Sequence, residues 1–468
     1  MKTAVVIGGG VSGLAAAHYL GKKSNFAKIL VLEASSRLGG WLQSIHHPDG
    51  SVQELGPRSI RPAGRAGQNT LELVEELNLA DQVLWVRAQN RYLYVNGEKC
   101  ALPNSLGALV KAQKPFSRSF LSYIMKEVFQ KRSDEEDESI YDFMERRMGK
   151  EMACYAFDPL CRGIFAGDIR HLSMRSCFPE LYKLEKHYGS IVKGFLFSPK
   201  DKSQITSKLV KKARLERWST YSFRRGVLQL VNALEESLRQ TKGTEIHTDA
   251  PCSKLHFTSD GKLVVSVNGE EVKADHVFSS IYAKNLSQIL SKDHSSFTSD
   301  LRKIPAVNVV VVCVEIAEKL NLIESGFGHL LPSSEDRKVL GVVYDSCVFP
   351  QHDRQDIPSS RFTVMMGGAW YEELKGMSDQ ELQELAISSL FTQMGISGTV
   401  SKVKVTLMKE CIPQYLVGHH QLLERIFTYI QDRNLPLSLV GSSYRGPSIN
   451  DCINNARIEV ERISKLYC

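Results

Sequence analysis

A glycine-rich turn directly after an apolar strand constrains this chain more than any other feature of its sequence. Residues 4–7 are continuously apolar, as a parallel strand buried on both faces requires. The turn Gly8-Gly9-Gly10-Val11-Ser12-Gly13 follows, then a helical run over 14–20 and a second apolar run over 29–32. This β-turn-α-β unit predicts a parallel sheet with right-handed crossovers.

The same turn predicts a dinucleotide site. Gly8 permits the tight turn, Gly10 lets the backbone approach a diphosphate, and Gly13 allows close helix–sheet packing. The amides at the positive end of the helix would bind the diphosphate. Glu33 lies 20 residues after Gly13, at the end of the second strand, where its carboxylate can accept hydrogen bonds from ribose hydroxyls. A purely structural glycine turn does not require that carboxylate, so dinucleotide binding is the favoured interpretation.

Three further motifs favour FAD over NAD as the dinucleotide. They are Arg37-Leu38-Gly39-Gly40-Trp41, Glu54-Leu55-Gly56-Pro57-Arg58-Ser59, and the pair Gly441–Tyr444 and Gly446–Ile449. All three resemble signatures of the FAD-binding amine oxidase and desaturase superfamily. A helix that begins at the last motif would aim its amide dipole at the pyrimidine end of the flavin, where negative charge develops on reduction.

The length of the chain and the recurrence of strand-turn-helix segments predict several domains. A chain of 468 residues exceeds one simple core, and strand-turn-helix texture recurs at the start, around 215–283 and after residue 437. A short strand is expected at Ala274–Phe278 and a sheet over 305–370. The nucleotide-binding domain is therefore predicted to be discontinuous. No apolar run reaches 18 residues, and no signal or transit segment is recognised at the start, so neither a spanning helix nor a cleaved presequence is expected.

Residues 98–214 differ from the rest of the chain. Helical periods dominate, with apolar positions such as Leu106 and Phe129, and an acidic loop is expected at Asp134–Glu138. The segment holds 22 lysines and arginines against 15 aspartates and glutamates, which accounts for the entire net charge of +7. These helices suit a membrane surface, an acidic partner or a solvated basic face. Cysteines and histidines show no metal-ligand spacing, so no metal site is predicted.

Five segments carry a narrower resemblance, which extends over essentially the whole chain. They resemble the animal members of the protoporphyrinogen oxidase family: Arg58–Gly64, Gln89–Val95, Leu160–Gly167, Phe327–Leu330 and Cys411–Tyr415. The resemblance implies a multidomain fold of α/β and α+β class. Its parts are a discontinuous Rossmann-like FAD-binding domain (1–97, 215–285 and 405–468), a helical membrane-binding domain (98–214) and a mixed-sheet substrate-binding domain (286–404).

The resemblance also implies an activity. This is FAD-dependent oxidation of protoporphyrinogen IX to protoporphyrin IX, the penultimate step of heme biosynthesis, with six electrons removed in three two-electron steps. Dioxygen would be the acceptor and H2O2 its product. The family further implies noncovalent FAD, a homodimer, and peripheral attachment to the mitochondrial inner membrane on the intermembrane-space side. Ferrochelatase is a candidate partner, and no nucleic acid is expected.

Site residues follow from the family motifs. Arg91 would pair bidentately with a propionate carboxylate, and Leu330 and Met365 would sandwich the macrocycle beside Gly328. No residue is assigned as a general acid or base. The FAD contacts are expected at Gly8, Gly9, Gly10, Val11, Ser12, Gly13, Glu33, Ala34, Trp41, Gly56, Pro57, Arg58, Ser59, Pro251, Ser442, Pro447, Ser448 and Ile449.

Four positions depart from the family pattern. Pro251 and Pro447 lie in FAD-contacting segments yet have no N–H to donate. Arg225 stands where a second glycine is usual, and Tyr282 replaces a common proline.

Two rival functions stay open at this stage. The first is another FAD-dependent amine oxidase or desaturase, which would lack the Phe327–Leu330 element and the context of Arg91. The second is a GDI-like binding protein without redox activity. The complete R-x-G-G element and C-terminal FAD motif argue against that class.

Overall fold

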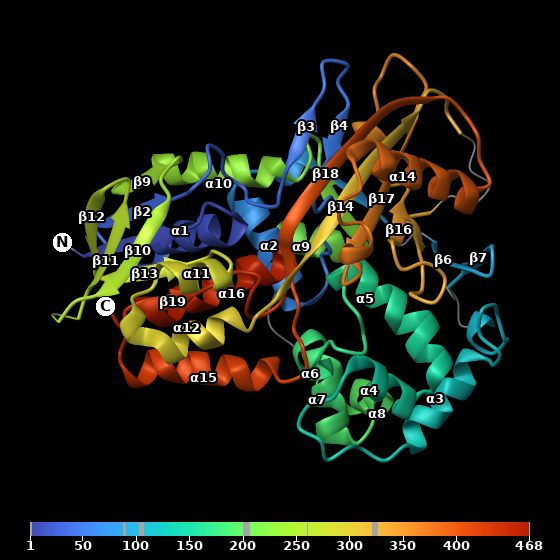
Figure 1. Ribbon diagram of the computed structural model, residues 1–468, viewed down its shortest axis with the longest axis horizontal. Helices are drawn as coiled ribbons and strands as arrows, with labels where there is room; N and C mark the ends of the chain where they lie inside the picture. Colours follow the sequence, from blue (N-terminus) through green and yellow to red (C-terminus); the bar gives the residue numbers. More distant parts are fainter. Residues whose placement is uncertain are drawn as a thin grey trace.

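The computed structural model describes residues 2–87, 90–102, 107–199, 206–259, 261–320 and 326–467. Two main sheets lie side by side, and a helical region packs below the second (Figure 1). Both marked chain ends lie on the far side of the first sheet from that region.

The first sheet is entirely parallel. Its order is β19-β13-β1-β2-β9. The strands are β1 (Thr3–Ile7), β2 (Lys28–Leu32), β9 (Thr244–His247), β13 (His276–Ser279) and β19 (Leu437–Leu439). Strands from the start, middle and end of the chain therefore share one sheet, as the recurring strand-turn-helix texture predicted.

Alternate residues of these strands enter two separate cores. Val6 and Val31 face one layer of helices: α1 (Val11–Lys23), α2 (Gly64–Glu76), α9 (Lys208–Leu215), α10 (Leu228–Gln240) and α16 (Ile449–Ser464). Val5 and Leu30 face the other layer, made of α11 (Ala283–Ile289), α12 (Ser295–Arg302), α15 (His419–Asp432) and the antiparallel strands β10 (Cys252–Phe257), β11 (Leu263–Val267) and β12 (Glu270–Ala274). This two-sided burial is the reason for the unbroken apolar runs.

The prediction of one strand over Ala274–Phe278 was wrong. Ala274 ends β12 in the three-stranded sheet, and β13 begins at His276 in the parallel sheet. Asp275 lies between them, and its carboxylate accepts a hydrogen bond from the Thr3 amide at 2.7 Å. The polar residue thus marks the point where the chain passes from one sheet to the other.

The second sheet is mixed and has the order β18-β14-β17-β16-β15-β6-β7. Its pairs are antiparallel except β6 with β15, which run parallel. Helix α14 (Asp379–Met394) covers one face. The strands are β6 (Arg91–Val95), β7 (Glu98–Ala101), β14 (Ala306–Ile316), β15 (Gly328–Leu330), β16 (Val339–Val343), β17 (Ser360–Gly368) and β18 (Val400–Pro413).

The topology differs from the expected domain boundaries in two places. The β6–β7 hairpin joins the second sheet, although residues up to 97 were expected in the FAD-binding domain and those after it in the helical one. Strand β18 likewise continues across the boundary at 404–405. Tyr92 is buried within the core of the second sheet. Local periodicity predicts a strand, but it cannot tell which sheet the strand joins.

Two short antiparallel pairs lie outside the two main sheets. Strands β3 (Ser44–His46) and β4 (Val52–Glu54) form one pair, and β5 (Val83–Val86) and β8 (Thr220–Phe223) form the other. The short helix α13 (Asp345–Val348) packs against β17.

The helical region has its own small core. The expected acidic loop Asp134–Glu138 does separate two helices, and a π-helical segment, Met152–Phe157, leads into α5. Leu106 lies outside the described residues. Along the described ranges, no helix is both long and apolar enough to cross a bilayer. The helices are α3 (Phe120–Phe129), α4 (Ile140–Arg147), α5 (Asp158–Phe165), α6 (Met174–Cys177), α7 (Pro179–Tyr188) and α8 (Ile191–Phe197).

Candidate functional site

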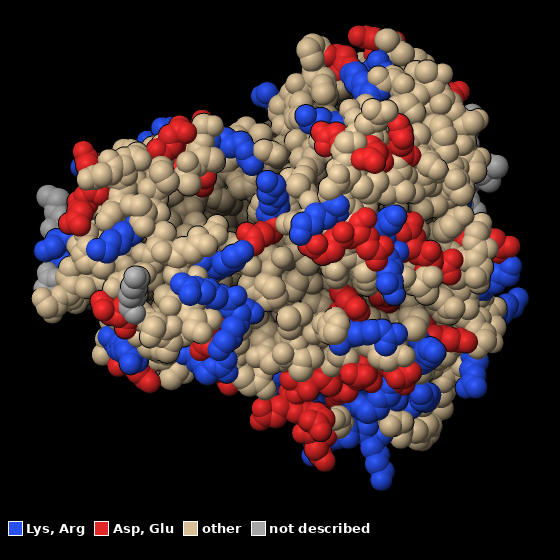
Figure 2. Space-filling view, in the orientation of Figure 1, with Lys and Arg blue, Asp and Glu red and all other residues tan. Residues whose placement is uncertain are grey.

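A cavity of about 1890 Å³ lies where the two sheets and the helical region meet. Ligand pockets usually enclose roughly 300–1,000 Å³, so this one has room for a dinucleotide and a second molecule together. Figure 2 shows a deep hollow between the lobe at left, which carries the first sheet, and the lobe at upper right, which carries the second.

The glycine turn forms one wall of this cavity. The Gly39 amide donates to the Gly9 carbonyl at 2.8 Å, which presses the R-x-G-G turn against the glycine turn. A β-carbon at Gly10 would have no protein atom nearer than the Gly40 Cα, at 3.9 Å. The space beside Gly10 is therefore open to the cavity, as a backbone that approaches a diphosphate requires.

The other glycines of the motif serve packing. A β-carbon at Gly13 would lie 1.9 Å from the Gly8 carbonyl oxygen, so no side chain fits there. Gly8, Gly10, Val11 and Ser12 line the cavity, whereas Gly9 and Gly13 are behind its surface. The structure thus divides the predicted motif into residues that face a ligand and residues that let the helix approach the sheet.

Glu33 holds the turn and also faces the cavity. Its Oε2 accepts from the Gly9 amide at 2.7 Å, and its Oε1 accepts from the Ser35 amide at 2.8 Å. Oε1 also accepts from the Ser35 hydroxyl at 2.7 Å, so Oε2 is the oxygen that keeps a further lone pair for a ribose hydroxyl. The Ala250 amide donates to the Glu33 carbonyl at 2.8 Å. That bond brings Pro251, together with Ala34, to the same end of the cavity.

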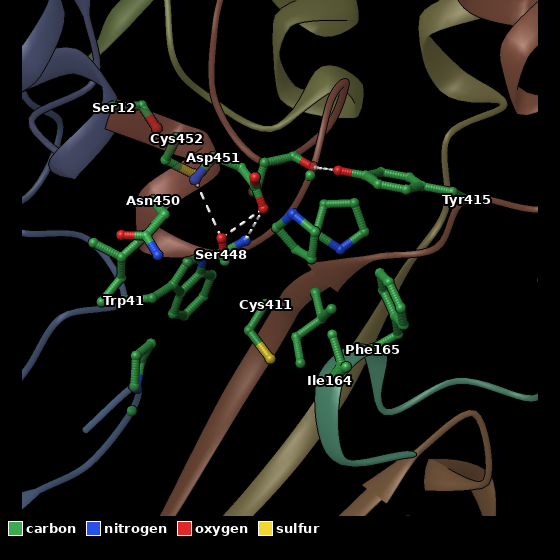
Figure 3. Close-up of a pocket in the computed structure, with 18 of the residues that line it drawn as sticks. Ser12, Trp41, Ile164, Phe165, Cys411, Tyr415, Ser448, Asn450, Asp451 and Cys452 are labelled. Carbon is green, nitrogen blue, oxygen red and sulfur yellow. Dashed lines mark hydrogen bonds between the residues drawn. The ribbon is translucent and has the colours of Figure 1, made fainter. Parts of the chain in front are cut away.

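The start of α16 forms the opposite end (Figure 3). Ser448 caps the helix, and its side chain and that of Asp451 close a capping box. The first-turn amides of Ile449 and Asn450 have no carbonyl partner within the helix, so they can bind the electron-rich edge of a ligand. Pro447 lines the cavity here without needing to donate.

Asn450 is a site residue that the sequence motifs did not single out. Its Nδ2 donates to the Arg61 carbonyl at 2.7 Å, while its buried Oδ1 has no partner within the described chain. An unpaired buried acceptor costs free energy, about 1–3 kcal/mol, unless a ligand N–H satisfies it. The imide N–H of a flavin is such a donor. The position of Asn450 directly after Pro447–Ile449 was the available signal.

Trp41 and the segment 56–59 line the cavity between these two ends. A β-carbon at Gly56 would lie 2.3 Å from the Trp41 carbonyl oxygen, so the two segments are in close contact. Arg58 is buried, and its Nη1 donates to Asp345 Oδ1 at 2.7 Å. Burial alone would lower the pKa of the Arg58 guanidinium, but Asp345 outweighs it and the pKa is raised. Arg58 is thus a fixed positive charge.

The four predicted substrate residues come together on the second sheet. Arg91 lies opposite Gly328 in the β6–β15 register, and Leu330 and Met365 both lie opposite Gly341 of β16. All four line the cavity. Gly328 has φ +153°, and a β-carbon there would lie 2.2 Å from the Val342 carbonyl oxygen, so only glycine fits.

Helix α5 closes the slot over Leu330. A β-carbon at Gly163 would lie 3.0 Å from Leu330 Cδ2, and one at Gly341 would lie 2.8 Å from the same atom. Leu330 is therefore held between two glycine positions to which sequence reasoning gave no role. Ile164 and Phe165 of α5 also face the cavity, opposite the α16 terminus in Figure 3. The slot is lined by apolar side chains, as a flat macrocycle would require.

A buried carboxyl group lies behind the cavity wall. Glu54 Oε2 accepts from Ser44 Oγ at 2.7 Å, and its Oε1 accepts from the Val227 amide at 2.7 Å. Burial raises the pKa of Glu54 to about 7.

The turn beside Glu54 explains why an arginine is tolerated at position 225, where the family usually has a glycine. Arg225 is exposed, and Gly226, with φ +74°, fills the position where a β-carbon would meet Glu54 Oε1 at 2.5 Å.

The departure at Tyr282 is also accommodated. Tyr282 lines the cavity, and its hydroxyl donates to the Ile304 carbonyl at 2.7 Å, which ties α11 to the segment after α12. Ser442 lines the cavity as well, and its carbonyl accepts a hydrogen bond from the Tyr415 hydroxyl. Gln89, part of a motif used above, lies outside the described residues.

Fold and cavity together define a flavin-dependent oxidoreductase: residues 11–464 match the family described as flavin-containing amine oxidoreductase. Protoporphyrinogen oxidase of Homo sapiens is 42% identical over 97% of both chains, and that of Schizosaccharomyces pombe is 32% identical over 98% of both. The chain therefore belongs, within that family, to the protoporphyrinogen oxidases. Among solved structures, cyclohexylamine oxidase of Brevibacterium oxydans has the same fold, with a TM-score of 0.70, 14% identity and 99% coverage of both chains.

FAD is the cofactor that this site holds. The carboxylate of Glu33, the open space at Gly10 and the unpaired Oδ1 of Asn450 match a ribose, a diphosphate and a flavin imide, respectively. The amine oxidase-like fold and the family membership agree with these residues.

Proposed function

We propose that the chain oxidises protoporphyrinogen IX to protoporphyrin IX in heme biosynthesis, with FAD as cofactor. The observation that carries this proposal is the shared cavity: a dinucleotide cradle and an apolar slot with an arginine at its edge lie in one space. Bound FAD would accept two electrons at a time and pass them to dioxygen as H2O2. Three such rounds remove the six electrons of the reaction.

The chain's own residues supply orientation and a dry slot. Leu330 and Met365 would lie against the macrocycle, with Gly328 beside them in the wall of the slot. Arg91 would hold a propionate carboxylate through two parallel N–H bonds. The pyrrole protons would leave to solvent, and no side chain is assigned as their acceptor.

Product fluorescence tests the activity directly. Protoporphyrinogen is not fluorescent and protoporphyrin is, so purified flavin-loaded protein should produce fluorescence under air and should leave monoamines and polyamines untouched. Oxidation of amines without oxidation of the porphyrinogen would favour the amine oxidase alternative. A protein that binds no flavin would favour the GDI-like alternative.

Membrane attachment through the helical region is the second part of the proposal. Phe129 at the end of α3 is 78% exposed, and Phe195 and Phe197 of α8 are 64% and 72% exposed. Helices α3 and α8 pack against each other, and both carry lysines, Lys126 and Lys193. Exposed aromatic residues flanked by lysines are typical of helices that lie in a membrane interface.

The remaining elements of the proposal follow from the family resemblance: a homodimer on the intermembrane-space side of the mitochondrial inner membrane, with ferrochelatase as a candidate partner. A substrate as apolar as protoporphyrinogen supports a location at a membrane surface, since it partitions into lipid.

A further inference from the structure

Two arginines at the substrate end of the cavity lack an anionic partner. Arg61 and Arg91 both line the cavity, and neither forms an ion pair with any residue that the structure describes. Of the other cavity arginines, Arg58 pairs with the carboxylate of Asp345. Arg175 contacts His420, and Arg445 lies 4.5 Å from the Phe427 ring, so these two also have no carboxylate partner in the described chain, but of the cavity arginines only Arg61 acts on the charge of Arg91.

The backbone of Arg61 is fixed between two elements while its side chain is exposed to the cavity. The Ile60 amide donates to the Tyr221 carbonyl of β8 at 2.7 Å. The Arg61 carbonyl accepts from Asn450 Nδ2 at 2.7 Å. Arg61 is thus anchored to the N-terminus of α16, which faces the proposed flavin position. Its side chain lines the same cavity as Arg91 of β6.

Arg91 is fixed in a similar way. Its carbonyl accepts from the Leu102 amide at 3.0 Å, and its guanidinium carbon lies 5.7 Å from the centre of the Phe327 ring. Burial by the cavity walls and the positive charge of Arg61 both lower the pKa of Arg91. The two cations are therefore close enough to repel each other, and a dianion between them would relieve that repulsion.

We propose that Arg61 binds a second carboxylate of the substrate while Arg91 binds the first. This inference rests on the proposed function. A porphyrinogen with two propionate side chains on neighbouring rings carries two carboxylates, both ionised near neutral pH. One arginine fixes a single point and leaves the ring free to turn in its slot, whereas two fix its orientation. Arg61 is thus a residue for positioning and for selection of dicarboxylates.

The test compares a dicarboxylate with its ester. Protoporphyrinogen IX and its dimethyl ester would be assayed with wild type, Arg61→Met, and Arg65→Met as the matched control, because Arg65 is exposed on the adjacent α2 and does not line the cavity. Arg61→Met should raise KM for the diacid at least about 10-fold and leave KM for the diester within twofold of wild type. Arg65→Met should change neither.

Equilibrium binding provides a readout without turnover. The affinity of the flavin-loaded protein for protoporphyrin IX should fall at least about 10-fold in Arg61→Met, while its affinity for the dimethyl ester and its flavin absorbance stay at wild-type levels. Equal losses for diacid and diester, or no loss for either, would overturn the role of Arg61. Failure of the wild type to oxidise either porphyrinogen would instead refute the proposed function.

Discussion

At the scale of single residues, the glycines of the turn meet two different physical demands: space for a ligand, and close packing of the helix on the sheet. Gly10 borders open space, whereas Gly13 lies against the Gly8 carbonyl. The first demand comes from the ligand and the second from the fold. Substitution by alanine should therefore have opposite consequences at the two positions.

Gly10→Ala should fold normally and bind FAD poorly. Its β-carbon meets no protein atom closer than 3.9 Å but takes space in the cradle, so the apoprotein should melt within about 2 °C of wild type while FAD affinity falls at least about 10-fold. Gly13→Ala should instead destabilise the apoprotein by roughly 2 kcal/mol or more, because backbone must move. Thermal melts and flavin titrations measure both. If the two variants lost the same FAD affinity and the same stability, this division of roles between Gly10 and Gly13 would be contradicted.

Glu54 predicts a pH dependence of stability. Its pKa rises from an ordinary 4.5 to about 7 in the folded protein, so folding favours the protonated form. That contribution is complete below pH 4.5 and is lost as pH rises through 7, a change on the order of 3 kcal/mol. Glu54→Gln mimics the protonated acid and should keep its stability. The melting temperatures of the two proteins should diverge in favour of the variant between pH 5 and pH 8; parallel curves would refute the assignment.

At the scale of elements, α5 and β15 set the width of the substrate slot. Leu330 lies within reach of a β-carbon at Gly163, so packing of the helix positions this side chain. A substitution in α5 that displaces Leu330 should therefore weaken substrate binding and leave flavin binding unchanged.

Gly163→Val should push Leu330 into the slot. The expected result is a rise of at least about fivefold in KM for the porphyrinogen with unchanged flavin absorbance, because FAD binds at a different part of the cavity. Gly107→Val, at an exposed position of the same 98–214 segment without a positive φ and with nothing within 4 Å of its β-carbon, is the control for general disturbance. Loss of flavin in Gly163→Val would contradict this account.

The sequence predicted single elements better than their assembly. The β1–α1–β2 unit, the acidic loop at 134–138 and the helix after Gly446 lie where periodicity and glycines placed them, because each depends on local interactions. The β6–β7 hairpin and the break at Asp275 depend on which sheet a strand joins, and that is a long-range choice. Asn450 and Arg61 were missed for the same reason, since their roles arise only where β8, α16 and β6 converge.

At the scale of the whole molecule, the exposed apolar side chains of α3 and α8 predict a membrane contact. Phe129→Ser combined with Phe197→Ser should abolish most binding to vesicles that contain anionic lipid, because each exposed aromatic contributes on the order of 1.5–3 kcal/mol when buried. Neutralising Lys126 and Lys193 should weaken binding more at low salt than at high salt. Vesicle sedimentation measures both effects, and unchanged binding in the aromatic variant would exclude this surface.

The same scale explains why one chain folds into three regions around one cavity. The proposed flavin cradle comes from the first sheet, the proposed macrocycle slot from the second, and the closing wall from the helical region. Each region alone would leave the cavity open to water. Their junction surrounds the proposed substrate slot with apolar side chains, and a lower local dielectric there would strengthen polar interactions with the substrate.

The most direct measurement is anaerobic mixing of the purified, FAD-loaded protein with protoporphyrinogen IX, followed by absorbance of the bound flavin. Electrons that leave the substrate without dioxygen present have the flavin as their acceptor, so the absorbance near its visible maximum should bleach and then return when air is admitted. A flavin that keeps its colour in the presence of excess porphyrinogen would contradict the account.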